Sequence, residues 1–145
     1  MCKLGDIIVV DGFKNEIGEK VNKHSFVVIN DEPNSIEGFN YDFVSNMLCS
    51  FHGDNHKKKK LRYKENIEVN QLIDNSKRAN NKSGFIKADQ LYYFDKNTIN
   101  YYVLGRLNED LLDELLKLIL VLNEEGKIKL VTTNIEKKLT TVWFL

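Results

Sequence analysis

The apolar residues of this 145-residue chain fall into short β-branched runs, and only one stretch late in the chain has helical spacing. Ile7 to Val10 and Phe26 to Ile29 are bounded by turn-forming residues, which is typical of buried strands. Further strands are expected over residues 41–51, 67–69, 85–94 and 99–104. Strands and helices do not alternate, which argues against a doubly wound sheet. The pattern favours a mainly β (α+β) fold, a small antiparallel barrel with one helix packed on it.

One long helix is expected between Asn108 and Gly126. Asn108 is a favoured N-cap residue, and acidic residues follow it in the first turn, where they complement the helix dipole. Leucine and isoleucine recur at helical spacing from Leu111 to Leu122, and this apolar stripe must pack against another element. Gly126 is the expected end of the helix. The β-branched stretches 128–133 and 139–145 then suggest a terminal β-hairpin.

Length and composition predict one soluble globular domain over residues 1–145. The chain is 42% hydrophobic and 29% charged, which is not the profile of a disordered protein. Its formal net charge is zero, so any surface that binds nucleic acid must be local. The longest apolar run, Leu115 to Leu122, is too short to span a membrane, and no apolar signal stretch follows Met1. We therefore expect a cytoplasmic protein, and its two cysteines show neither metal-ligand spacing nor a disulfide framework.

Side chains that can carry chemistry gather in one segment directly after the third expected strand. This segment contains Ser50, His52, His56, Lys57, Lys58, Lys59 and Lys60, and its basic part can form a short helix. Histidine transfers protons near neutral pH because its unperturbed pKa is about 6.5. Lysine neutralises phosphate charge. The segment therefore has the groups that are needed to move a proton at a phosphate ester.

Each of these residues also has a structural interpretation. Ser50 can satisfy a backbone group at a strand end, His56 can be a surface residue, and the lysines can form a solvated face. Cys49 is interpreted as a small buried hydrophobe. The aromatic residues of the later strands can stack on bases, but alternating aromatics in strands usually belong to a core.

Four stretches occur in a characteristic order: residues 5–11 (GDIIVVD), 24–31 (HSFVVIND), 87–91 (KADQL) and 105–109 (GRLNE). In order and spacing they resemble the small endoribonuclease toxins of the MazF/PemK/Kid type and their type III relatives, the ToxN and CptN toxins. The tetrad Cys49 to His52 falls where MazF-like chains have Thr-Ser and ToxN-like chains have a Thr-Ser-Pro-Lys type of sequence. The second strand and the Gln-Leu-Tyr-Tyr-Phe run are closest to the CptN branch.

The chain also departs from the family pattern. His24 stands where MazF-like chains have an arginine, Cys49 replaces a threonine, and His52 stands where ToxN-like chains have a lysine. Residues 123–145 extend beyond the usual end of MazF.

The resemblance implies an SH3-like antiparallel barrel and metal-independent cleavage of RNA with no cofactor. In that reaction the ribose 2′-hydroxyl attacks the adjacent phosphorus and leaves a 2′,3′-cyclic phosphate. The implied catalytic residues are His24, Ser50 and His52. The histidines would act as acid and base if their strand ends are neighbours, and Ser50 would donate to a phosphate oxygen. The implied RNA contacts are Lys23, His56, Lys57, Lys58, Lys59, Lys60 and Gln90. His24 can instead be an exposed loop residue, and Gln90 can be structural.

A protein of this family is the toxin of a bacterial toxin–antitoxin system. The CptN-like features imply a small structured RNA as antitoxin, which the toxin also cuts from a precursor. A MazF-like chain would instead be a homodimer that a small acidic protein neutralises, and an RNA-bridged assembly is a further alternative. A non-catalytic SH3-like module that binds RNA or protein is the hypothesis from a different class.

Overall fold

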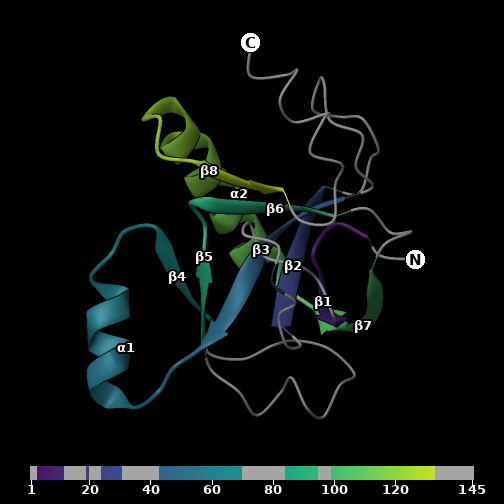
Figure 1. Cartoon of the computed structure of the whole chain (residues 1–145). Helices are drawn as coiled ribbons and strands as arrows, with labels where there is room; N and C mark the ends of the chain where they lie inside the picture. Colours follow the sequence, from purple (N-terminus) through teal and green to yellow (C-terminus); the bar gives the residue numbers. More distant parts are fainter. Residues whose placement is uncertain are drawn as a thin grey trace.

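The computed structural model describes residues 3–11, 19, 24–30, 43–69, 84–94 and 99–132. These residues form eight strands and two helices (Figure 1). In chain order the elements are β1 (Asp6–Asp11), β2 (His24–Asn30), β3 (Phe43–Ser50), α1 (Asp54–Leu61), β4 (Asn66–Val69), β5 (Gly84–Lys87), β6 (Gln90–Phe94), β7 (Asn100–Arg106), α2 (Glu109–Glu124) and β8 (Lys129–Thr132). The mainly β (α+β) class expected from the sequence is confirmed for this part of the chain.

All of these strands belong to one sheet, whose main path is β4-β5-β3-β2-β1-β7. Strand β3 is the branch point, because it pairs with β2 on one side and with both β5 and β6 on the other. Strand β8 pairs with β6 in parallel, whereas the other pairings of the described strands are antiparallel. Within the described residues β4 and β7 do not pair with each other, so the sheet is not closed.

Alternation along the strands sends neighbouring apolar side chains to opposite faces of the sheet. On one face, Ile7, Val27 and Ile86 pack with Leu115 and Leu122 of α2, which lies behind the sheet in Figure 1. We call this the helix face. The opposite face, which we call the aromatic face, carries a second buried cluster: Ile8, Val10, Phe26, Val28, Phe94 and Ile99.

Helix α2 begins and ends where the sequence predicts. The Oδ1 of Asn108 accepts a hydrogen bond from the backbone N–H of Asp110 at 2.8 Å. After the last turn Gly126 has a φ of +71°, and the N–H of Lys127 donates to the carbonyl of Leu122 at 2.9 Å. This is a Schellman motif, in which a residue in the left-handed conformation lets the chain satisfy the last helical carbonyls.

The expectation of one strand over residues 85–94 is wrong. The segment divides into β5 and β6, with a turn at Ala88 and Asp89. The side chain of Asn46 on β3 explains the division, because its Nδ2 donates to the carbonyl of Lys87 at 3.0 Å and to that of Gln90 at 2.9 Å. The amide therefore holds both sides of the turn at the point where β3 changes its partner from β5 to β6.

The end of the chain also differs in part from the sequence prediction. The stretch expected over residues 128–133 forms β8, but its partner is β6, and the stretch 139–145 that would complete the hairpin lies outside the described residues. Residues 13–23 and 74–84 also lie almost wholly outside them. Neither described helix is long and apolar enough to cross a membrane.

Candidate functional site

The register of the sheet brings the beginning of β2 beside the end of β3. Ser25 is the antiparallel partner of Leu48, so His24 lies next to the Cys49 end of β3. Phe26 belongs to the aromatic face, and His24, two residues earlier, shares that face. Partial burial lowers the pKa of the His24 imidazole. The strand ends that carry His24 and His52 are therefore neighbours, which is the arrangement on which the acid–base hypothesis depends.

Four rings gather directly after β3, and we call them the histidine–aromatic cluster: Phe51, His52, His56 and Phe85. Cys49 is the partner of Phe85, and alternation places Phe51 on the same face as Cys49. The Phe51 and Phe85 rings accordingly stack, with centroids 5.3 Å apart. The His56 ring lies 6.4 and 6.1 Å from these two rings, and the His52 ring lies 4.8 Å from His56. The two imidazoles stand together, with His52 exposed and His56 half-buried.

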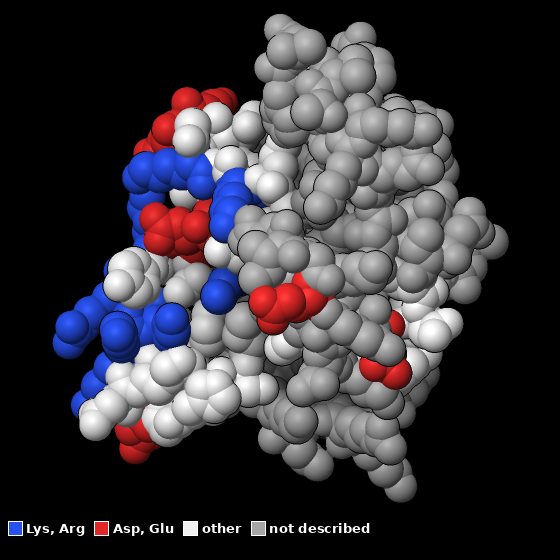
Figure 2. Space-filling model, viewed as in Figure 1, with Lys and Arg blue, Asp and Glu red and all other residues white. Residues whose placement is uncertain are grey.

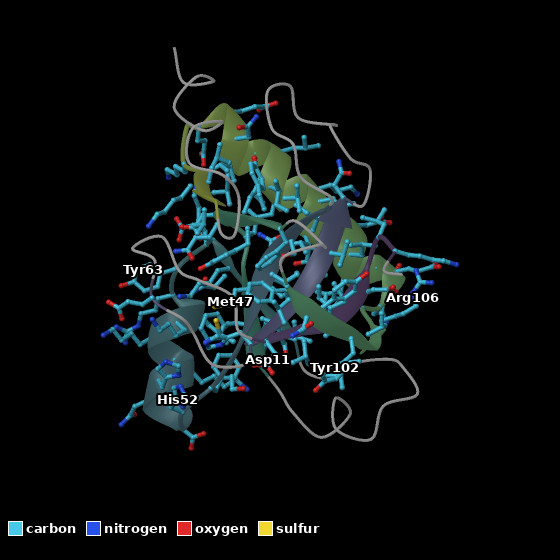
Figure 3. The ribbon with its side chains drawn as sticks, turned by 45° about the vertical axis from the view of Figure 1, so that its right-hand side comes forward. Asp11, Met47, His52, Tyr63, Tyr102 and Arg106 are labelled. Carbon is cyan, nitrogen blue, oxygen red and sulfur yellow. The ribbon has the colours of Figure 1, made fainter. Side chains whose placement is uncertain are left out.

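A turn at Gly53 makes this pairing of histidines possible. Gly53 has a φ of +107°, a conformation that residues with side chains rarely adopt, and α1 begins at the next residue. Figure 3 shows His52 beside one end of α1. The backbone N–H of His52 donates to Nδ1 of His56 at 3.0 Å. The first turn of α1 therefore folds back onto the residue that precedes the glycine.

The surroundings of His56 favour its neutral form. Contact with the phenylalanine rings removes water from the imidazole, and this desolvation lowers its pKa. The positive charges of His52, Lys60 and Lys59 lower the pKa of His56 further. A neutral imidazole presents one nitrogen as acceptor and the other as donor, so the His56 Nε2 carries its proton while Nδ1 accepts from His52.

Helix α1 carries the lysine run and has no buried residue. The Nζ of Lys57 lies 2.9 Å from a carboxylate oxygen of Glu68 and 5.6 Å from the centroid of the Phe51 ring, so this lysine ties α1 to β4 and to the cluster. Lys58 and Lys59 are exposed, and Lys60 is half-buried. Among the described residues these three lysines have no carboxylate partner. Figure 2 shows the resulting basic surface on the side of the molecule that holds α1.

The other predicted site residues lie around the cluster rather than within it. Ser50 is exposed at the last position of β3, and alternation places it on the opposite face from Cys49. Gln90 begins β6, where its Oε1 accepts from the hydroxyl of Tyr92 at 3.4 Å. Burial raises the pKa of the Cys49 thiol, which agrees with a packing role. Lys23 lies outside the described residues.

Two other kinds of site, a metal centre and a surface depression, do not compete with the cluster among the described residues. No three histidine, cysteine, aspartate or glutamate side chains of this part of the chain gather as metal ligands do. A shallow depression of about 480 Å³ is lined by residues 106–110 at the beginning of α2. Two carboxylates, those of Glu109 and Asp110, and one guanidinium, that of Arg106, line it, so its net charge does not favour a phosphate. In Figure 3 Arg106 lies far from His52.

Two features of the site were not predicted from the sequence: the stacked rings of Phe51 and Phe85, and the contact between the His56 and His52 rings. The four-residue spacing of the histidines gave no reliable signal, because His52 lies outside α1 and only the turn at Gly53 brings it to His56. Phe85 gave no such signal, because only the β3–β5 register brings it to the cluster. In the comparison with known proteins, neither a protein-family model nor a curated sequence matches the chain.

Proposed function

We propose that this protein is an endoribonuclease that cleaves RNA without a metal ion, through attack of a ribose 2′-hydroxyl on the adjacent phosphorus. The observation that carries the proposal is the strand register that brings His24, at the beginning of β2, beside the end of β3, which leads into His52 and a helix with exposed lysines. Imidazoles suit proton transfer near neutral pH, and lysines suit the phosphates on either side of the reacting one.

The reaction requires two proton transfers at one phosphate. The 2′-oxygen forms a bond to phosphorus while the bond to the 5′-oxygen of the next nucleotide breaks, which gives a 2′,3′-cyclic phosphate and a free 5′-hydroxyl. A base takes the 2′-hydroxyl proton, and an acid supplies a proton to the departing 5′-oxygen. We assign these transfers to His52 and His24, which approach from neighbouring strand ends. Ser50 is exposed at the end of β3 but lies on the opposite face from Cys49 and His24, so it is assigned no step at this phosphate.

We also propose that the sheet is an SH3-like barrel and that the protein is a toxin of a bacterial toxin–antitoxin system. The resemblance of residues 5–11, 24–31, 87–91 and 105–109 to the family supports both proposals. A small structured RNA is the antitoxin that best suits the site, because it would occupy the same basic surface on α1 as the substrate. This arrangement would let one RNA serve as both inhibitor and processed product.

The purified protein is expected to cleave single-stranded RNA in the presence of EDTA and to leave 2′,3′-cyclic phosphate and 5′-hydroxyl ends. The expectation follows because histidine proton transfer needs no metal. The measurement is a gel of end-labelled RNA, with the ends identified by their reactivity toward phosphatase and kinase. Intact RNA that is nevertheless bound would instead support the non-catalytic binding module, and intact, unbound RNA would contradict both functions.

The double substitution Lys58→Gln and Lys59→Gln is expected to weaken RNA binding and to make it less sensitive to salt. If each lysine contacts one phosphate, the slope of log affinity against log salt should fall by about 0.7 per lost contact. Fluorescence anisotropy with labelled RNA over a range of salt measures both quantities. The matched control is Lys3→Gln with Lys117→Gln, which removes the same charge from two exposed positions elsewhere. Equal losses in both double variants would mean that α1 is not the RNA contact.

A further inference from the structure

The beginning of α1 is held by a histidine in place of the usual cap. Gly53 occupies the N-cap position and has no side chain that could accept from the first helical N–H groups. His56, at the third helical position, instead reaches back, and its Nδ1 accepts from the backbone N–H of His52 at 3.0 Å. In a capping box a glutamate or glutamine at this position performs the corresponding role. Here the His56 imidazole replaces that side chain, and the backbone N–H that it binds belongs to His52, a proposed catalytic residue.

We propose that His56 is a positioning residue that holds His52 at the site and that it acts only as a neutral imidazole. Its effect on cleavage rests on the proposed function, whereas its effect on His52 does not. The ring contact of 4.8 Å between the two histidines adds a second constraint on the His52 side chain. An exposed side chain directly before a glycine would otherwise have few contacts that fix its direction.

The dependence on protonation follows from the hydrogen bond itself. Nδ1 accepts only through its lone pair, so a second proton on His56 would turn the acceptor into a donor that faces the His52 N–H. The hydrogen bond would then be lost, and an imidazolium would stand beside His52, Lys59 and Lys60. The interaction is therefore present at pH values above the His56 pKa and is lost as the pH falls through it. That pKa is lowered from about 6.5, so His56 stays neutral at pH 7.

The other charged or titratable groups around His56 do not reverse this preference. On β4, the carboxylate of Glu68 is engaged by Lys57 at 2.9 Å. The titratable side chain of β3 is the Cys49 thiol, whose raised pKa keeps it neutral, and that of β5 is Lys87. The two phenylalanines that flank His56 are apolar. The charged groups that act on His56, which are His52, Lys59 and Lys60, all oppose a positive charge on its ring.

Two substitutions separate the acceptor from the titrating ring. In His56→Asn the side-chain oxygen takes the place of Nδ1 and cannot be protonated near neutral pH. His56→Leu keeps an apolar side chain of similar size against the phenylalanines but has no acceptor. If His56 acts by position, His56→Asn should cleave RNA about 10²-fold faster than His56→Leu, the scale expected for a misplacement of about 1 Å. In His56→Asn the acid-side loss of rate that comes from protonation of the His56 ring should be absent.

An NMR experiment on the ¹⁵N-labelled protein without RNA tests the interaction directly. At pH 7.5 we expect a scalar coupling across the hydrogen bond between the His52 amide nitrogen and His56 Nδ1, and this coupling should vanish with the titration of the His56 ring. A coupling that is absent at pH 7.5, or that persists after the ring is protonated, would overturn the inference even if the protein cleaves RNA. A coupling that follows the titration in a protein that never cleaves RNA would support the positioning of His52 and contradict the nuclease proposal.

Discussion

Replacement of His52 by alanine is expected to slow RNA cleavage by about 10²- to 10⁴-fold, the usual contribution of a general acid or base. The change removes the exposed imidazole but keeps the backbone N–H that donates to His56, so the beginning of α1 should remain intact. Stability should change by no more than about 0.5 kcal/mol, as for most surface substitutions. Single-turnover cleavage of a labelled RNA measures the rate, and thermal unfolding measures the stability.

The matched control is Asn55→Ala, which alters an exposed residue of α1 between the two histidines. It should retain the cleavage rate of the unaltered protein. A His52→Ala protein that cleaves RNA at an unchanged rate would remove His52 from the mechanism. A large loss of stability in the same variant would show instead that the imidazole has a structural role.

The largest effect on stability is expected for Leu115→Ala in α2. Leu115 is fully buried against the helix face of the sheet, so its loss removes apolar burial and leaves a cavity. Substitutions of this kind destabilise proteins by about 2–5 kcal/mol. Urea unfolding followed by circular dichroism measures the free energy of unfolding.

Leu120→Ala is the control within the same helix, because Leu120 is 65% exposed whereas Leu115 is 0% exposed. The two variants change helix propensity equally, so the difference between them reports burial alone. Leu120→Ala should stay within about 0.5 kcal/mol of the unaltered protein. Equal losses at both positions would contradict the packing of α2 against the sheet.

Local sequence patterns predicted those parts of the fold that local interactions determine. The β-branched runs at residues 7–10 and 26–29 form β1 and β2. Helix α2 begins directly after the Asn108 N-cap and ends shortly before Gly126. The division of residues 85–94 was not predictable in this way. It depends on Asn46, whose side chain bonds to carbonyls 41 and 44 residues further along the chain. The parallel pairing of β8 with β6 likewise joins residues far apart in the sequence, so no local pattern predicts it.

The candidate site was predictable in composition but not in arrangement. The concentration of Ser50, His52, His56 and lysines was plain from the sequence. Their grouping depends on the turn at Gly53 and on a phenylalanine that arrives from β5. The pairing of β3 with β5 places Ser50 and Cys49 on opposite faces of the sheet.

The pairing of β1 with β7 has a consequence for synthesis of the chain. β1 comprises Asp6–Asp11, and one of its two neighbours is Asn100–Arg106. During translation β1 can pair with β2 early, but its other edge stays open until β7 has left the ribosome. Closing a loop of that length costs more entropy than closing a hairpin, so this pairing belongs to the later steps of folding. The nascent chain therefore presents an apolar, unpaired strand edge for most of its synthesis, which is the kind of surface that chaperones bind.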